Sequence, residues 1–305
     1  MASKDIIYSE TFYSIQGEGT FTGRPTVWVR LFGCNLECNG FGQRSPDKPE
    51  TYELPYAELD ITGYTSVEQL PVFTRGCDSS YSWSKKFRHL NKTGTASDIC
   101  DRLEALIPNK RFWYEEDKGN QDKHLCFTGG EPFIKRSQKS IVLILEELIK
   151  RNNTPLNITF ETNGSKELIP ELKDMFYDFE AYSPIIKIFF SVSPKLFSVT
   201  GEIPAKAIKP EVVKSYNEYS DGQLKFVVNG TEKCWQELES VISLFRSEGV
   251  KFPVWIMPVG GTVEGLNGEI PGHMNSGDIA NEALRRGYNV AARVHAYLFG
   301  NKIGT

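Results

Sequence analysis

Three cysteines of this chain could act together as ligands of an iron–sulfur cluster. Cys34 and Cys38 lie close together in GCNLEC, and Cys77 follows much later in GCDSSYSW. Three thiolates can hold a [4Fe–4S] cluster and leave the fourth iron open to a ligand. The early pair alone is more often two buried cysteines than two ligands, and Phe41, where a third ligand would be expected, cannot bind iron. Cys77 is therefore the candidate third ligand.

A second group with chemical potential is the sequence TGGEP at 128–132. Consecutive glycines allow the backbone to approach a ligand closely, and Pro132 fixes the turn. Glu131 offers an acceptor for an ammonium group. The same string is also common in an ordinary turn from a strand into a helix. Combined with three cysteines, it favours a site for the methionine end of S-adenosylmethionine, next to the open iron.

The composition narrows the class of partner. The chain has 305 residues, a net charge of −4 and 40% hydrophobic residues, as expected for a globular protein. No apolar run reaches the roughly 20 residues that a membrane-spanning helix needs, and the first residues do not resemble a secretory signal. We therefore expect a cytoplasmic protein with reduced cysteines and no membrane partner. The absence of a basic domain argues against direct binding to nucleic acid and favours a small-molecule substrate.

Alternating strand and helix patterns must position these residues. Strands are expected at 6–15 and 26–33, and the second leads directly into Cys34. Later strands read as nearly continuous apolar runs, which is typical of a parallel sheet covered by helices. These strands are expected at 124–132, 157–164, 186–195, 222–230 and 252–261. Helices are expected at 97–107, capped by Ser97, and at 137–151. The carboxyl ends of parallel strands would meet at one mouth.

Residues 39–76 interrupt this alternation. They contain scattered apolar residues and recurring prolines, with no sustained period of a strand or a helix. We interpret them as an insertion between the second and third cluster cysteines, within a single domain that spans 1–305. A long structureless loop is unusual in a compact domain, so the insertion should carry short strands or turns and pack on the site. Cys100, Cys126 and Cys234 are expected to be buried structural residues.

Several sequence strings together carry a family resemblance. They are FYSIQGEGTFTGRPTVWVRLFGCNLEC, CDSSYSW, FTGGEP, FETNGS, SVSPK and LKFVV, and they cover nearly the whole chain in order. In this combination the chain resembles the radical S-adenosylmethionine enzymes, and closely the 7-carboxy-7-deazaguanine synthase family, with an unusual insertion inside the cluster motif. The resemblance implies a partial, open α/β barrel of about six parallel strands and a homodimer.

The resemblance also implies roles for individual residues. The cluster ligands would be Cys34, Cys38 and Cys77, and Ser79, at a position where the family has threonine, would bind Mg²⁺. The residues implied for the cofactor S-adenosylmethionine are Asp78, Gly129, Gly130, Glu131, Ser193, Lys195, Met257 and Pro258. The residues implied for the pterin substrate are Ile15, Gln16, Gly17, Glu18, Arg30, Thr128 and Glu161. Gly76 stands where related enzymes often carry an aromatic residue, so support for the adenine must come from elsewhere.

The implied reaction converts 6-carboxy-5,6,7,8-tetrahydropterin to 7-carboxy-7-deazaguanine with loss of ammonia. An electron donor such as flavodoxin would supply the reducing equivalent, and the product could serve queuosine or a modified DNA base. Two other hypotheses remain open from the sequence. One is a glycyl-radical-activating enzyme, which uses the same cluster on a protein partner. The other is a zinc-stabilised binding module, for which the sequence offers no fourth ligand.

Overall fold

The computed structural model of the protein describes residues 5–114, 121–182, 185–270 and 273–305. Its centre is a nine-stranded sheet. The strands of this sheet are β1 (Ile6–Ile15), β2 (Pro25–Leu31), β3 (Lys92–Gly94), β6 (His124–Gly129), β7 (Asn157–Thr162), β8 (Lys187–Val192), β9 (Gly222–Val228), β10 (Val254–Pro258) and β11 (Asn289–Val290). A separate small sheet pairs β4 (Trp113–Tyr114) with β5 (Gln121–Asp122).

The order of the main sheet is β11-β10-β9-β8-β7-β6-β2-β1-β3. All pairings from β2 to β11 along this order are parallel, whereas β1 pairs antiparallel with both β2 and β3. Within the described residues the edge strands β3 and β11 do not pair with each other, so the sheet remains open. The predicted open barrel is confirmed, because β2 and β6 to β10 supply six parallel strands and the two-residue β11 only extends one edge.

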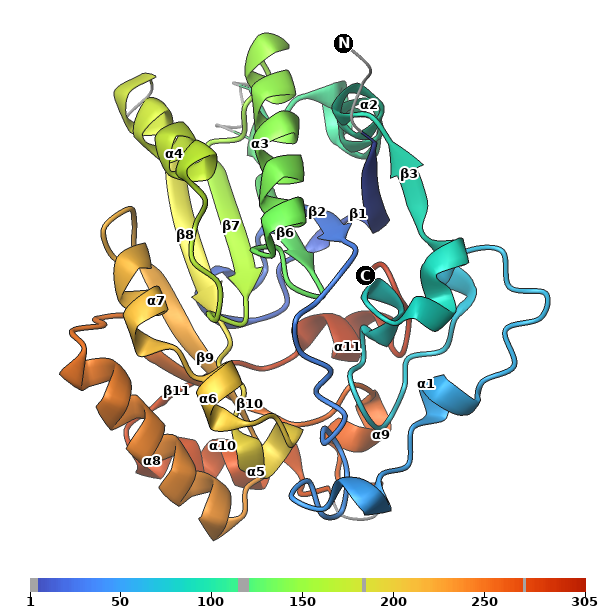
Figure 1. Ribbon diagram of the computed structural model, residues 1–305, viewed down its shortest axis with the longest axis vertical. Helices are drawn as coiled ribbons and strands as arrows, with labels where there is room; N and C mark the ends of the chain where they lie inside the picture. The colour runs from blue at the N-terminus through green and yellow to red at the C-terminus, as the bar shows by residue number, and fades with distance from the viewer. Residues whose placement is uncertain (1–4, 115–120, 183–184, 271–272) are drawn as a thin grey trace.

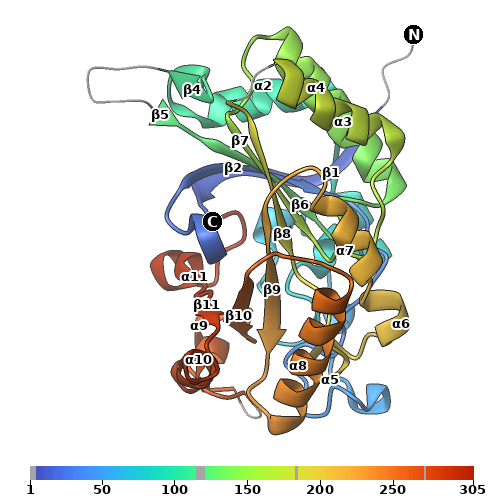
Figure 2. The ribbon, with the colours of Figure 1, turned by 90° about the vertical axis from the view of Figure 1, so that its left-hand side faces the viewer.

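The helices connect these strands. They are α1 (Pro55–Glu58), α2 (Ala96–Leu106), α3 (Lys135–Lys150), α4 (Pro170–Tyr182), α5 (Phe197–Thr200), α6 (Pro204–Ala207), α7 (Pro210–Tyr216), α8 (Glu232–Ser247), α9 (Val263–Leu266), α10 (Ser276–Arg285) and α11 (Val294–Phe299). In Figure 2, α2, α3 and α4 lie on one side of the sheet, and α11 with the C-terminus lies on the other. A search of the described residues finds no helix able to cross a membrane.

The helix at α2 corrects one prediction from the sequence. Its N-cap is Thr95 and not Ser97, because Thr95 Oγ1 accepts a hydrogen bond from Asp98 N at 3.1 Å and the Asp98 carboxylate accepts one from Thr95 N at 2.8 Å. This reciprocal pair is a capping box. Ser97 instead accepts a hydrogen bond from Arg151 at 2.7 Å.

The core fixes the strand ends that form the mouth of the barrel. Phe127 on β6, Phe160 on β7 and Phe190 on β8 are fully buried and contact one another, with ring centroids 5.6 Å and 6.0 Å apart between neighbouring strands. Such aromatic contacts add to the energy of burial. The prediction that Cys100, Cys126 and Cys234 are buried is confirmed, since each is 0% exposed.

The segment 39–76 is an irregular excursion, labelled by α1 in Figure 1, that contains turns and short helices. Besides α1 these are the 3-10 helices η2 (Pro49–Thr51) and η3 (Val67–Gln69). All of its residues are described and none forms a strand, so the expectation of short strands or turns is met by the turns. The segment has a small apolar core of its own, which also takes in residues after Cys77 and near the C-terminus. Its buried residues are Tyr56, Val67, Leu70, Phe73, Tyr81, Phe87, Leu90 and Ile303.

Candidate functional site

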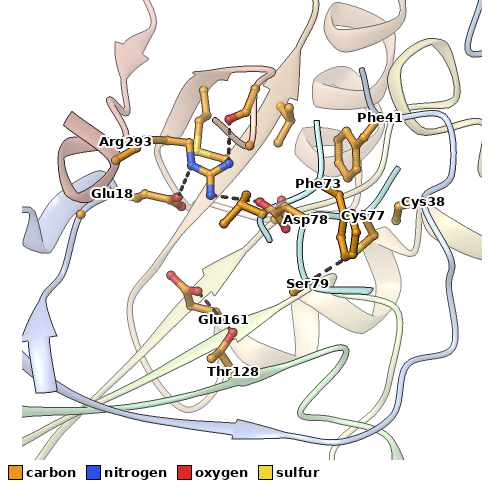
Figure 3. Close-up of a pocket in the computed structure, with 18 of the residues that line it drawn as sticks. Glu18, Cys38, Phe41, Phe73, Cys77, Asp78, Ser79, Thr128, Glu161 and Arg293 are labelled. Atoms are coloured by element: carbon orange, nitrogen blue, oxygen red, sulfur yellow. Dashed lines mark hydrogen bonds and ion pairs between the residues drawn. The ribbon is translucent and has the colours of Figure 1, made fainter. Parts of the chain in front are cut away.

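A cavity of about 280 Å³ lies at the carboxyl ends of the parallel strands. Its walls come from three parts of the chain that are distant in sequence: the strand ends, the segment 39–76 and the C-terminal residues after α10. Every site residue predicted from the sequence lines this cavity, except Glu131. Figure 3 shows Cys38 and Cys77 on one side of the cavity and Glu18 and Glu161 on the other. The arrangement agrees with the general position of ligands in such sheets.

The three predicted cluster cysteines lie in one group. Cys34 and Cys77 pack against the small apolar cluster that contains Cys38. The loop between the first two is fixed by Glu202, whose carboxylate accepts hydrogen bonds from the backbone N–H groups of Glu37 and Cys38 at 2.7 and 2.8 Å. The structure therefore brings the third cysteine to the first two despite the intervening residues.

Two backbone hydrogen bonds explain how the long segment returns to this group. Gly76 N donates to the carbonyl oxygen of Phe41 at 2.8 Å, so residues 42–75 leave and re-enter the site at adjacent points. Gly40 N donates to Thr200 O at 2.9 Å, which attaches the start of the segment to α5. Both Phe41 and Phe73 line the cavity beside the cysteines (Figure 3). These aromatic rings are candidates for the adenine support that Gly76 cannot provide.

Burial disfavours the ionised form of all three thiols. Burial raises the pKa of Cys34 to about 12, raises the pKa of Cys38 well above its usual value, and also raises the pKa of Cys77. A bound metal group must therefore supply the positive charge that stabilises the thiolates. No set of three or more His, Cys, Asp or Glu side chains in the described residues is arranged to hold one metal ion.

The two glycines of TGGEP are required by close backbone packing. A Cβ on Gly129 would lie 2.4 Å from Leu31 O, and one on Gly130 would lie 2.5 Å from Gly33 O. Glu131 N also donates to Gly33 O at 2.8 Å. The turn after β6 is therefore packed directly on the loop that carries Cys34. The backbone of this turn thus lies beside the three grouped cysteines.

Glu131 is the predicted site residue that the structure places differently. Its side chain is 0% exposed and does not line the cavity. One carboxylate oxygen accepts hydrogen bonds from Phe133 N and Thr162 Oγ1 at 2.8 and 2.7 Å, and the other accepts one from Asn163 N at 2.7 Å. Burial raises the pKa of Glu131. Glu131 thus joins the TGGEP turn to the ETNGS loop after β7, because three internal donors hold its carboxylate away from the cavity.

Polar side chains from β6, β7, β9 and the loop after β1 form the other side of the cavity. Glu161 Oε1 accepts a long hydrogen bond from Gln16 Nε2, and Glu161 Oε2 accepts one from Thr128 Oγ1, each at 3.4 Å. Lys225 on β9 forms ion pairs with both Glu18 and Glu161, the latter at 3.5 Å. Burial raises the pKa of Glu18, but Lys225 and Arg293 lower it more strongly, and the resulting pKa is about 2. Glu18 therefore carries a negative charge at neutral pH.

Arg293 links the two sides of the cavity. Its NH2 group lies 3.0 Å from Asp78 Oδ2, its Nε lies 3.4 Å from Glu18 Oε1, and its NH1 donates to Gly260 O at 2.8 Å. Burial raises the pKa of Asp78, but the effect of Arg293 is opposite and larger, so the pKa lies below its usual value. One guanidinium thus bridges a carboxylate beside Cys77 and a carboxylate beside Gln16 (Figure 3).

The remaining predicted cofactor residues face the cysteine side. Lys195 Nζ donates to Ser193 Oγ at 3.0 Å and lies 5.7 Å from the centre of the Phe41 ring. Among the described residues no carboxylate forms an ion pair with Lys195, so its charge is available to an anion. Met257 and Pro258 line the cavity at the end of β10.

Sequence reasoning missed several residues that line this cavity, among them Lys225, Arg293, Phe73 and His295. A lysine inside the apolar string LKFVV was a usable signal for the first, because a lysine is rarely buried without a carboxylate partner. Arg293 and His295 belong to a short, weakly patterned C-terminal stretch that packs on the IQGEG loop, where Val294 N donates to Gly17 O at 3.0 Å. No local pattern indicates that contact.

Comparisons with known proteins agree with the geometry. No protein-family model matches the chain. The 7-carboxy-7-deazaguanine synthase of Rhodopirellula baltica is 26% identical to it, with 100% of this chain and 90% of that protein covered. The enzyme of the same name from Pyrobaculum aerophilum is 25% identical over 97% of this chain and 95% of its own length. A crystal structure of QueE from Escherichia coli, 17% identical, matches with a TM-score of 0.50 over 95% of both chains and supports the fold. The resemblance predicted from the sequence is confirmed.

Proposed function

We propose that this chain, a relative of the 7-carboxy-7-deazaguanine synthases, is a radical S-adenosylmethionine enzyme. It converts 6-carboxy-5,6,7,8-tetrahydropterin to 7-carboxy-7-deazaguanine with loss of ammonia, as a step of 7-deazapurine biosynthesis. The observation that carries this proposal is that one cavity combines three grouped cysteines with an opposing set of amide, carboxylate and guanidinium groups. The whole-length relatives of that name support it.

Cys34, Cys38 and Cys77 would hold the [4Fe–4S] cluster. When bound, such a cluster would supply the electron for reductive cleavage of S-adenosylmethionine. The chain itself contributes a buried, largely apolar surround for the cysteines, formed by Leu36 and Ala207. Exclusion of water by such a surround protects reactive intermediates from side reactions.

S-Adenosylmethionine would bind beside the cysteines. The backbone of Gly129 and Gly130 can approach the methionine end. Lys195, which forms no ion pair with a described carboxylate, can attract the methionine carboxylate. Asp78, Ser193, Met257 and Pro258 complete this wall. Glu131 would act indirectly, by holding the turn against the loop after β7.

The pterin would occupy the opposite wall. A pterin ring presents alternating donors and acceptors, which Gln16 and the carboxylates of Glu18 and Glu161 can match. Ile15, Gly17 and Thr128 line the same wall, and Arg30 supplies a guanidinium for the pterin carboxylate. Lys225 would hold the two carboxylates in place through its ion pairs with them.

Ser79 would be the protein ligand of Mg²⁺. Its hydroxyl lies 3.5 Å from Cys77 Sγ, at the edge of the cavity. The neighbouring carboxylate, Asp78, is paired with Arg293. One hydroxyl is a sparse protein contribution, but Mg²⁺ commonly keeps several waters and takes further oxygens from substrate.

The remaining parts of the proposal concern organisation and partners. Residues 39–76 form an insertion within a single domain, and a flavodoxin-type donor supplies electrons. A homodimer is supported by α11, which exposes the consecutive apolar residues Tyr297, Leu298 and Phe299. A glycyl-radical-activating activity is disfavoured, because the full-length relatives carry the synthase name.

Anaerobic reconstitution tests the proposed function. The protein should take up iron and sulfide, and with dithionite, S-adenosylmethionine and 6-carboxytetrahydropterin it should form 7-carboxy-7-deazaguanine, detected by mass spectrometry, together with ammonia. No protein partner should be needed. A fully loaded cluster without product, or turnover only of a protein substrate, would reject the proposal.

A further inference from the structure

Arg30 forms an ion pair with the buried carboxylate of Glu10, a residue that sequence analysis did not single out. Its Nε lies 2.7 Å from Glu10 Oε1, and the two residues are direct cross-strand partners on β2 and β1. Glu10 is 1% exposed. Each of these ions is costly to remove from water unless the other is close, so Glu10 and Arg30 are held together.

A local irregularity in β1 creates this pairing. The register of β1 against β2 shifts between Tyr8 and Glu10, so Ser9 is an extra residue at a β-bulge. Ser9 Oγ donates to Asn91 Oδ1 at 2.5 Å, and the amide of Asn91 donates to the carbonyl oxygens of Tyr81 and Phe87. Bulges change the direction in which a strand presents its side chains. Here the bulge places Glu10 directly opposite Arg30.

Tyr81 completes the arrangement. Its hydroxyl donates to Glu10 Oε1 at 2.8 Å, and its ring lies 5.9 Å from the guanidinium carbon of Arg30. The second oxygen, Glu10 Oε2, is buried and has no hydrogen-bond partner among the described residues. Glu10 is therefore directed at Arg30 and Tyr81 through a single oxygen.

This geometry leaves one edge of the guanidinium for a ligand. Nε is committed to Glu10, and NH1 makes only a long contact, 3.4 Å, with Gly129 O. Arg30 lines the cavity, so the NH1 and NH2 groups form the edge available to a carboxylate. We propose that Glu10, supported by Tyr81, is a positioning residue that fixes Arg30 to select pterins carrying a 6-carboxylate over pterins without one. The inference rests on the proposed function.

The test is the ratio of two affinities. Reconstituted protein with S-adenosylmethionine is titrated with 6-carboxypterin and with pterin, and binding is followed by ligand fluorescence. The parent should favour 6-carboxypterin. Glu10→Gln should reduce that preference about tenfold, in keeping with the strength of hydrogen bonds to charged groups. Affinity for pterin itself should change little, because the proposed ring contacts with Gln16, Glu18 and Glu161 remain.

Controls separate positioning from general destabilisation. Glu147→Gln breaks a similar pair, Glu147 Oε1 with Arg151 Nε at 2.9 Å on α3, outside the cavity, and should leave the preference unchanged. Tyr81→Phe removes only the hydroxyl and should reduce the preference to a smaller degree; it decides the question if Glu10→Gln does not fold. An unchanged preference in a folded Glu10→Gln protein, or in Tyr81→Phe when that variant must decide, would overturn the inference. Failure of the parent to turn over the carboxylated tetrahydropterin would instead reject the proposed function.

Discussion

The backbone N–H of Gly76 donates to the carbonyl oxygen of Phe41 across the base of the segment 42–75. This hydrogen bond joins the two ends of the segment. Cys77, the next residue, therefore lies in the group that contains Cys38. A motif divided by a long stretch of sequence is thereby contiguous in space. The first prediction follows from this contact.

Cys77→Ala should lose cluster iron as severely as Cys34→Ala. A cluster left with two protein thiolates is poorly held, so iron and sulfide content after anaerobic reconstitution should both fall. Cys100→Ala, Cys126→Ala and Cys234→Ala are the controls, since these cysteines are fully buried away from the cavity. Retention of a full cluster in Cys77→Ala, or its loss in Cys100→Ala, would contradict the assignment.

Phe73 should stabilise the segment 39–76 as well as line the cavity. It is 4% exposed and packs edge-on against Tyr56, with ring centroids 6.1 Å apart. Removing a buried phenylalanine costs about 3–5 kcal/mol, so Phe73→Ala should lower the free energy of unfolding by roughly that amount if the segment unfolds with the domain. Urea unfolding measures the change, and Phe73→Leu should show a smaller one. An unchanged urea midpoint would show that the segment is not part of the cooperative unit.

Lys225→Met should destabilise the protein in a pH-dependent way. Breaking a buried ion pair costs about 3–5 kcal/mol, because it leaves Glu18 and Glu161 without their shared cation. In the parent the pKa of Glu18 is about 2, below its usual 4.5, so the stabilisation is present above pH 4.5 and is lost as the pH falls towards 2. In the variant the pKa of Glu18 should rise.

The difference in unfolding free energy between parent and Lys225→Met should therefore be largest near pH 7 and shrink towards pH 4, as the variant's carboxylates take up protons. Urea unfolding across this range checks the trend. Lys225→Arg keeps the charge and should retain most of the parent's pH dependence. A difference that is constant with pH would indicate lost packing and not lost charge pairing.

Glu131→Ala should lower the free energy of unfolding, and any loss of affinity for S-adenosylmethionine should accompany that loss of stability. The substitution leaves Phe133 N, Thr162 Oγ1 and Asn163 N without their acceptor in a buried setting. Each unsatisfied donor costs about 1–3 kcal/mol. Unfolding and S-adenosylmethionine affinity should be measured on the same reconstituted protein. Weakened affinity at unchanged stability would instead favour the direct contact with the ammonium group that the sequence suggests.

The sequence predicts the parallel sheet and most of the site because both depend on local patterns. Apolar strands followed by glycine or polar residues indicate where strands end, and parallel strands bring those ends together. The direction of a side chain at a turn is not local information. TGGEP does not reveal whether Glu131 faces a ligand or the loop after β7, since that depends on donors from Thr162 and Asn163.

The long-range ion pairs also cannot be predicted from the sequence. Arg293 reaches Asp78 and Glu18, which are more than 200 positions earlier in the chain, and its own neighbours form no distinctive motif. The bulge at Ser9 is also hidden, because β1 reads as a regular strand. The register shift at this bulge pairs Glu10 with Arg30, so the sequence alone does not identify Glu10 as the partner of Arg30.

The final prediction concerns the metal ligand. If Ser79 supplies an oxygen to Mg²⁺, Ser79→Ala should remove most of the stimulation of turnover by MgCl₂, whereas Ser79→Thr should retain it because threonine keeps the hydroxyl. The hydroxyl lies 3.5 Å from Cys77 Sγ, so the cluster's absorption spectrum and iron content must be recorded for each variant. A normal cluster with lost stimulation separates a role in metal binding from an effect on Cys77. Equal stimulation in Ser79→Ala and parent would remove Ser79 from the magnesium site and leave substrate and water oxygens as its ligands.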